Sequence, residues 1–161
     1  MIGRRPIWAR IRPASKPHGP APITTDARVT PGALHRALEQ LKTLQPLTHV
    51  TGSLHAAAWA DASGNITLVR EDVGRHNALD KVIGALARAG RVPAEGFFVV
   101  TSRASYELVQ KTAVAGAPLL AAVSRPTGLA IRFAEESGIA LVGLVRGETA
   151  NVYSHTHRVV S

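Results

Sequence analysis

The sequence predicts an α/β protein in which one mixed sheet of five strands is covered by helices on both faces. Apolar residues recur at helical spacing in several segments, short continuous apolar runs alternate with these segments, and glycine or proline ends most of them. Strands that are apolar throughout are typical of sheets covered on both faces. The chain has 161 residues, 45% of them hydrophobic and 19% charged, which suits one globular domain.

The first 29 residues differ in composition from the rest of the chain. Six of the ten prolines fall between Pro6 and Pro31, and such a density of proline is incompatible with a regular helix or a central strand. Residues 1–30 also hold six of the 19 basic residues but only one of the 11 acidic residues. Residues 1–29 are therefore predicted to be a poorly ordered arm, or the remnant of a missing N-terminal domain, and residues 30–161 the folded domain.

The predicted elements begin with a helix whose N-cap and first residue are Thr30 and Pro31, and which Pro46 ends. Strands at 56–60 and 66–70 then form a hairpin. The remaining elements are helix 77–89, strand 97–100, helix 105–115, strand 119–123, helix 127–137 and strand 140–145. A hairpin followed by alternating helices and strands is the layout of the cytidine-deaminase-like fold, a three-layer α-β-α sandwich.

Polar segments follow the predicted strands where a ligand would bind. In open α/β sheets, ligands bind beyond the carboxyl ends of the strands. The segments there contain hydroxyl groups, glycine and arginine, and they are residues 71–77, 101–105, 124–127 and 146–149. Three of the four lead into a helix, whose first N–H groups bind phosphate well beside an arginine. The sequence therefore predicts a phosphate-containing ligand at this edge.

Each of these residues also has a purely structural interpretation. Serine and threonine before a helix are most often N-caps, and a carboxylate near a cation can form a structural ion pair. The first interpretation applies to Ser102, Ser105 and Thr127, and the second to Glu71 or Asp72 with Arg75 or Lys81.

Several kinds of chemistry are not predicted. A zinc deaminase needs His-x-Glu and Pro-Cys-x-x-Cys, where this sequence reads His76-Asn77-Ala78 and Ser102-Arg103-Ala104-Ser105. We therefore expect no zinc and no other metal site. The chain has no cysteine, which excludes disulfides and a cysteine nucleophile within these residues. No apolar run is long enough to cross a bilayer and no signal peptide is evident, so we expect a cytoplasmic protein without a membrane partner.

Six segments resemble the signature blocks of the FdhD family of formate dehydrogenase accessory sulfurtransferases. They are Thr51–Ala57, Glu71–Lys81, Thr101–Glu107, Gly116–Pro118, Ser124–Thr127 and Asn151–Tyr153. They occur in the order and spacing of the family, and the resemblance covers residues 31–161. The Glu71–Lys81 block alone is long enough to make the resemblance specific.

The resemblance implies a cytoplasmic sulfurtransferase of molybdenum cofactor biosynthesis, with a zinc-free, deaminase-like C-terminal domain. Such proteins take sulfur from a cysteine desulfurase and pass it to molybdenum bis(molybdopterin guanine dinucleotide), which activates formate dehydrogenase. Homodimers are common in the family, and GDP is expected to mimic the bound part of the cofactor. The implied cofactor-binding positions are Gly74, Arg75, His76, Lys81, Ser102, Arg103, Ser105, Leu144, Val145, Arg146, Gly147, Glu148 and Thr149. Glu71 or Asp72 is the candidate acceptor for guanine N–H groups.

The sequence departs from the family in lacking its Cys-x-x-Cys. A persulfide needs a thiol, so no catalytic residue is assigned here. The expectation is a cofactor-binding domain whose recorded start lies inside a longer gene, through a wrong start or a frameshift. The alternatives are a non-catalytic cofactor-binding chaperone, an inactive truncated paralogue and, more distantly, a nucleic-acid binder that uses the basic arm.

Overall fold

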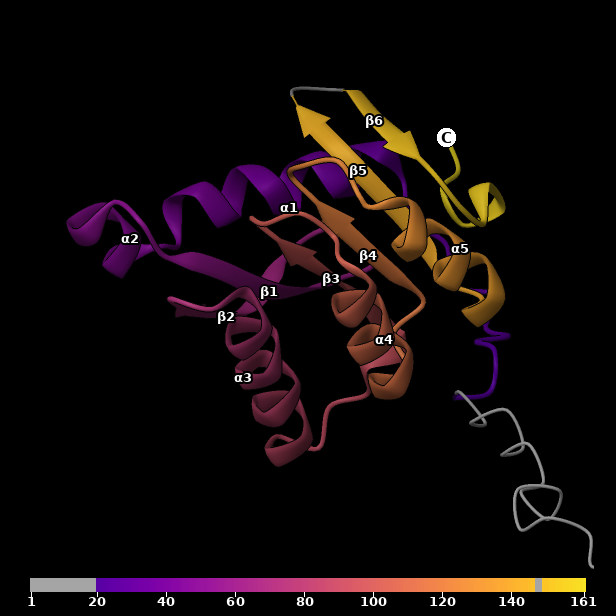
Figure 1. Cartoon of the computed structure of the whole chain (residues 1–161), viewed down its shortest axis with the longest axis horizontal. Helices are drawn as coiled ribbons and strands as arrows, with labels where there is room; N and C mark the ends of the chain where they lie inside the picture. Colours follow the sequence, from indigo (N-terminus) through magenta and orange to yellow (C-terminus); the bar gives the residue numbers. More distant parts are fainter. Residues whose placement is uncertain (1–19, 147–148) are drawn as a thin grey trace, which may run out of the picture.

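The centre of the structure is a mixed sheet with the strand order β2-β1-β3-β4-β5-β6 (Figure 1). This computed structural model describes residues 20–146 and 149–161, without the side chains of residues 144–146. The strands are β1 (His55–Asp61), β2 (Ile66–Asp72), β3 (Gly96–Val100), β4 (Leu119–Ala122), β5 (Ala140–Arg146) and β6 (Thr149–Val152). β3, β4 and β5 are parallel, whereas β1 is antiparallel to both its neighbours and β6 is antiparallel to β5.

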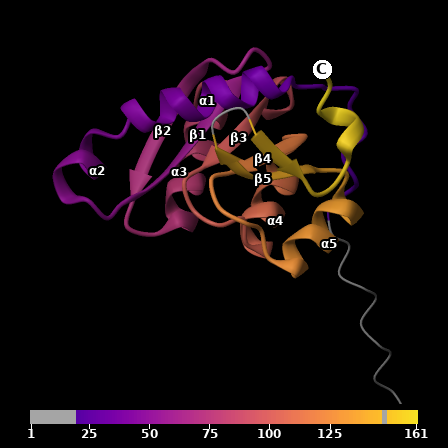
Figure 2. The same cartoon turned by 90° about the horizontal axis from the view of Figure 1, so that it is seen from above.

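Helices cover both faces of the sheet, as predicted. They are α1 (Pro31–Thr43), α2 (Pro46–Thr51), α3 (Arg75–Arg88), α4 (Tyr106–Ala115) and α5 (Gly128–Ser137), with 3-10 turns η2 (Pro93–Glu95) and η3 (Thr156–Arg158). α1 packs on one face, and α3, α4 and α5 pack on the other (Figure 2). Phe97 and Phe98 are neighbours on β3 and fill the two cores on opposite faces, because successive strand residues alternate in direction. Among the described residues, no helix is both long and apolar enough to span a bilayer.

Two elements differ from the predicted order. The sheet has six strands rather than five, so the predicted count is wrong by one. The missed strand, β6, alternates between exposed and half-buried residues and contains no apolar run that would indicate a strand. Pro46 follows the end of the first helix but also begins α2. Proline fits the first turn of a helix, because N–H groups there have no hydrogen-bond partner within the helix.

Part of the predicted arm is bound to the folded domain, beside α5 (Figure 1). We call residues 23–29 the N-terminal strap. The guanidinium of Arg158 is buried and donates hydrogen bonds to the backbone carbonyls of Thr25, of Ile23 at 3.0 Å and of Ala27 at 3.4 Å. These bonds offset part of the cost of burying the charge, and Nε of Arg158 has no hydrogen-bond partner among the described residues.

Backbone contacts secure both ends of the N-terminal strap. The N–H of Ile23 bonds to the carbonyl of Ser137 at 2.9 Å, and Val29 pairs with Val159 in a parallel bridge. Gly138 has a φ of +73°, and a Cβ there would overlap the carbonyl oxygen of Ile23. These contacts differ from the expected poorly ordered arm, and residues 1–19 of that prediction lie outside the described residues.

Candidate functional site

The carboxyl ends of four strands lie at one edge of the sheet, as the sequence predicts. β2 is antiparallel to β1 and β1 is antiparallel to β3, so β2 runs in the same direction as β3, β4 and β5. α3, α4 and α5 each follow one of these strands and therefore begin at this edge. We call it the carboxyl edge.

Asp72 organises the loop that leads from β2 into α3. Its Oδ1 accepts hydrogen bonds from the backbone N–H of Gly74 at 2.9 Å and the side-chain amide of Asn77 at 3.3 Å. Its Oδ2 lies 2.5 Å from Nζ of Lys81. These interactions, that with Lys81 foremost, lower the pKa of Asp72 from 3.8 to about 2. Gly74 is the N-cap of α3, and since it has no side chain, no side-chain oxygen caps the first N–H groups of the helix.

Glu71, the neighbour of Asp72, holds the start of α2. Its carboxylate accepts hydrogen bonds from the N–H groups of Leu47 and Thr48 at 3.0 and 2.8 Å and from the Thr48 hydroxyl. Partial burial raises the pKa of Glu71, but these bonds outweigh it and hold the pKa below its usual value. The carboxylates of Glu71 and Asp72 are thus engaged within the protein, and the ion-pair interpretation holds for Asp72 with Lys81. Their predicted role toward guanine stays a prediction.

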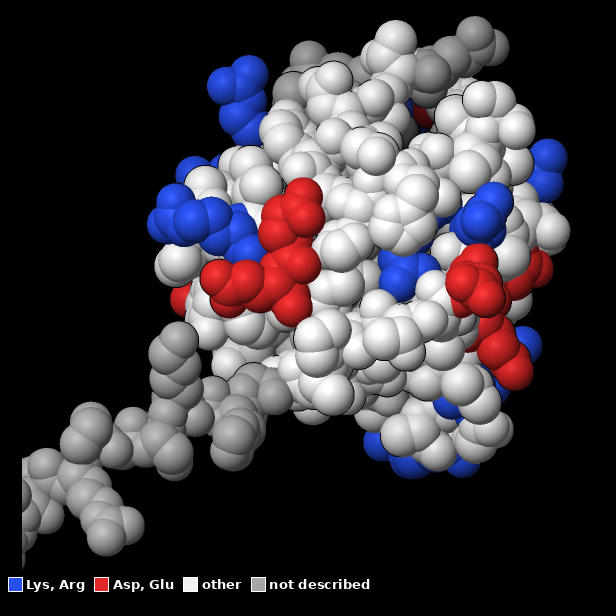
Figure 3. Space-filling model, turned by 90° about the vertical axis from the view of Figure 1, so that its right-hand side faces the viewer, with Lys and Arg blue, Asp and Glu red and all other residues white. Residues whose placement is uncertain are grey.

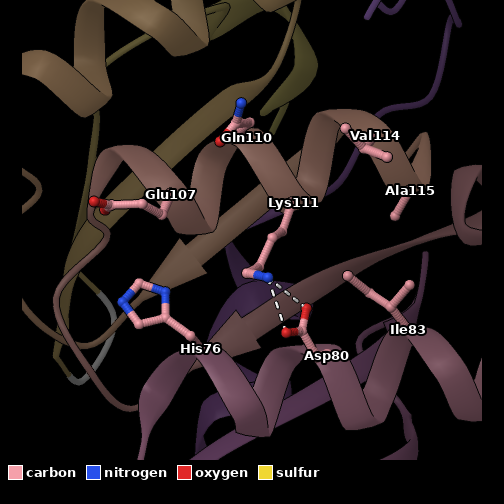
Figure 4. A pocket seen from close by; sticks show the side chains of 8 residues that line it. All are labelled: His76, Asp80, Ile83, Glu107, Gln110, Lys111, Val114 and Ala115. Atoms are coloured by element: carbon pink, nitrogen blue, oxygen red, sulfur yellow. Dashed lines mark hydrogen bonds and ion pairs between the residues drawn. The ribbon is translucent and has the colours of Figure 1, made fainter.

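A groove of about 660 Å³ lies between α3 and α4 (Figure 4). Its lining residues are His76, Asp80, Ile83, Glu107, Gln110, Lys111, Val114 and Ala115. In Figure 4, His76 and Glu107 lie at one end of the groove, and the ion pair between Lys111 and Asp80, at 2.8 Å, crosses its middle. Sequence reasoning missed the groove, although the spacing of His76, Asp80 and Ile83 places them on one helix face.

An arginine stands at the start of α3, opposite an acidic residue in the first turn of α4. Arg75 is half-buried, and its Nε is buried without a hydrogen-bond partner among the described residues. The pKa of Glu107 is lowered, first by its own backbone N–H and further by electrostatic attraction to His76 and Arg75. The start of α3 therefore carries a half-buried guanidinium, a group that binds anionic oxygens well.

The loop between β3 and α4 exposes only one of its three predicted binding residues. Ser102 and Ser105 are buried, and the Ser102 hydroxyl donates to the backbone carbonyl of Arg103 at 3.2 Å. Arg103 itself is exposed. Ser105 is the N-cap residue of α4 but its side chain makes no capping bond, whereas Thr127 caps α5 through the N–H of Ala130. The N-cap interpretation thus holds for Thr127.

The predicted segment 144–149 forms the end of β5 and the start of β6 at the same edge. Arg146 pairs with Thr149 across this hairpin, while Gly147 and Glu148 lie outside the described residues. Four strand intervals separate β2 from β5, which at about 4.8 Å each amounts to roughly 19 Å. Only an elongated ligand can contact both the start of α3 and this hairpin.

Charges of both signs lie on the face that Figure 3 shows. Lysine and arginine side chains form separate groups, and acidic side chains lie beside several of them. This face has no continuous basic surface of the kind that binds a nucleic-acid backbone. No group of three or more histidine, aspartate or glutamate side chains in the described part of the chain is placed to hold a metal ion.

Comparison with known proteins places the sequence in one family. Residues 9–160 match the model of the FdhD/NarQ family. The chain is 54% identical over 141 residues to the sulfur carrier protein FdhD of Bordetella bronchiseptica, which covers 88% of this chain and 51% of that protein. It is 55% identical over 159 residues to the sulfur carrier protein FdhD of Xanthomonas euvesicatoria pv. vesicatoria, covering 99% of this chain and 54% of that protein. The chain thus spans about half the length of these relatives.

A solved structure resembles the fold as well. The crystal structure of a protein from Desulfotalea psychrophila, described as a formate dehydrogenase accessory protein, matches with a TM-score of 0.79 and 29% identity. The match covers 87% of this chain and 60% of that one. Sequence and structure agree, and the chain belongs to the FdhD/NarQ family.

Proposed function

We propose that this chain is the cofactor-binding part of a sulfur carrier and that it binds the guanine dinucleotide part of molybdenum bis(molybdopterin guanine dinucleotide) as cargo. The names of its relatives support the role in sulfur transfer. The observation that carries the binding proposal is the start of α3. There, Gly74 leaves the first N–H groups without a side-chain cap, beside the half-buried guanidinium of Arg75.

The width of the carboxyl edge supports a dinucleotide rather than a compact anion. A diphosphate at the start of α3 would be within reach of the exposed Arg103, and an elongated ligand would extend toward residues 144–149. The antiparallel β1–β2 pair beside three parallel strands also supports the proposed deaminase-like layout.

The proposed task of these residues is to bind and orient the cofactor. Sulfur transfer uses a thiolate, and the 161 residues contain no cysteine, so we assign no covalent step to them. The proposed partners are a formate dehydrogenase, a cysteine desulfurase as sulfur donor and a second copy of the chain, in the cytoplasm. Sedimentation velocity tests whether two copies of the chain associate. A monomer at all concentrations would contradict the proposed homodimer.

Binding of GDP tests the proposed site. We expect titration calorimetry to detect binding to the 161-residue chain, and Arg75→Ala to weaken it about tenfold, the loss of one hydrogen bond to a charged group. Arg88→Ala is the matched control, because Arg88 is an exposed arginine at the opposite end of α3. If GDP gives no heat and no thermal shift, or if both variants bind alike, the proposed site is wrong.

A further inference from the structure

The outer edge of β2 carries backbone groups without a strand partner. The carbonyl of Ala56 on β1 accepts a hydrogen bond from the N–H of Thr101, which follows β3, so the backbone polar groups of Ala56 point toward β3. Because these groups alternate in direction along a strand, those of Ala57 point toward β2, where Arg70 lies opposite and pairs with it. The next residues along β2, Val69 and Glu71, therefore direct their N–H and C=O groups to the free edge.

Cationic side chains cover the carbonyls of this edge but leave its N–H groups free. A guanidinium N–H of Arg70 donates to the carbonyl of Val69 at 2.7 Å, and Nζ of Lys81 donates to the carbonyl of Glu71 at 3.1 Å. No acceptor for the N–H groups of Val69 and Glu71 is found in the described part of the chain. Charged side chains on an edge strand discourage pairing with a neutral or basic strand.

Two adjacent hollows follow the same edge. One of about 500 Å³ is lined by Leu44, Pro46, Leu47, Val69, Arg70, Glu71 and Lys81. The other, of about 290 Å³, is lined by Leu44 and by residues 66–69. Together they form a groove, which we call the β2 groove.

Apolar side chains that the fold leaves exposed form the wall of the β2 groove. α2 buries none of its residues and projects at one end of the molecule (Figures 1 and 2). Leu44 is 42% exposed and Leu47 55%. Exposed apolar side chains beside a groove are typical of sites that bind another protein.

The charge along the β2 groove indicates what kind of ligand the groove binds. Arg70 lines the groove and bonds to the carbonyl of Val69. Arg91 lies outside the lining, where it bonds to the Thr67 hydroxyl at 2.6 Å and stands over the ring of Trp59, 5.3 Å from its centre. Among the described residues, neither arginine has a carboxylate within ion-pair distance. The two nearby acids, Glu71 and Asp72, are already engaged by α2 and by Lys81. The groove thus has unpaired positive charge, free N–H donors and an apolar wall.

We propose that the β2 groove binds an extended, acidic segment of a partner protein as an added strand. The carbonyls of the segment accept from the free N–H groups of Val69 and Glu71, and a carboxylate of the segment replaces the neutral oxygen that Arg70 now contacts. Apolar side chains between them pack on Leu44 and Leu47. A second copy of the chain fits poorly, since pairing of two β2 edges would bring arginines against arginines.

Nuclear magnetic resonance of the 161-residue protein tests this surface with two capped peptides. One alternates valine and glutamate over six residues, and the other alternates valine and lysine. We expect the glutamate peptide to shift the amide signals of Val69 and Glu71, and the lysine peptide to leave them in place. Arg70→Glu should weaken binding of the glutamate peptide about tenfold by replacing attraction with repulsion. Arg132→Glu, on the exposed side of α5, is the matched control and should have no effect.

Each other result overturns the proposal. Equal shifts with both peptides would mean that charge does not select the segment. No shift at either amide would mean that Arg70 and Lys81 only protect the edge from pairing. Shifts of Val69 that grow with protein concentration without peptide would assign the groove to a second copy. Unchanged signals of Phe98 in both variants verify that the core is folded.

Discussion

Arg158→Ala is expected to lower the free energy of unfolding by about 3 kcal/mol, because it removes hydrogen bonds from a buried charged group to three carbonyls. The carbonyls of Ile23, Thr25 and Ala27 would lose their donor together. Burial lowers the pKa of Arg158, and the negative charge of Asp26 offsets only part of this effect. Urea denaturation followed by circular dichroism measures the change.

Local measurements distinguish release of the N-terminal strap from a general loss of stability. Hydrogen exchange at the N–H groups of Ile23 and Val29 should accelerate more than exchange at the N–H of Phe98 in the core. Arg132→Ala, at an exposed position of α5, should change stability by less than about 0.5 kcal/mol. Exchange at Ile23 and Val29 that is as slow in Arg158→Ala as in the wild type would contradict a role of Arg158 in holding the N-terminal strap.

Asp72→Ala is expected to weaken GDP binding about 30-fold, roughly the loss of two ordinary hydrogen bonds. Asp72 fixes the N–H of Gly74 and the ammonium of Lys81, and with them the direction in which α3 begins. Electrostatics alone predicts the opposite result, because removing a carboxylate favours an anionic ligand. We expect the loss of position to exceed this gain, since every contact at the start of α3 depends on the same turn.

Asp72→Asn separates the two effects. The amide oxygen still accepts from the N–H of Gly74, while the negative charge is gone. GDP should therefore bind to Asp72→Asn at least as tightly as to the wild type, and clearly more tightly than to Asp72→Ala. Tighter binding by both variants would show that Asp72 acts through its charge and not through the turn.

The same carboxylate predicts a dependence of stability on pH. The pKa of Asp72 is lowered to about 2 in the folded protein from an ordinary value of 3.8. Its contribution to stability is thus fully present above 3.8 and is lost as the pH falls through about 2. The difference in melting temperature between wild type and Asp72→Asn should shrink across this range. A difference that is constant across it would contradict the lowered pKa.

Much of the fold follows from patterns within single segments. The apolar run of β3 and the Thr30-Pro31 start of α1 are recognisable locally, because a buried strand needs continuous apolar residues and a helix start needs a cap. The carboxyl edge then follows from chain order, since a helix that returns between parallel strands must begin where the first strand ends. These rules placed the predicted loops at one edge of the sheet.

The remainder depends on contacts between distant residues. Nothing in the composition of residues 23–29 indicates that Arg158 binds them, because its partners are backbone carbonyls, which every residue has. β6 depends on its pairing with β5 rather than on its own apolar content. The sequence showed that Glu71 and Asp72 are neighbours of the site, but only the structure shows that Glu71 is directed to α2.

Adjacent carboxylates at the end of β2 offer a route for thermodynamic linkage between two surfaces, the β2 groove and the start of α3. Glu71 holds the first turn of α2, and Asp72 holds the first turn of α3. A ligand that displaces α2 therefore acts on the strand end that also positions Arg75, and the coupling must be reciprocal. If a peptide in the β2 groove changes the dissociation constant of GDP by a given factor, GDP changes the dissociation constant of the peptide by the same factor. Titrations of each ligand in the presence of the other measure this factor, and a factor of one would show that the two carboxylates act independently.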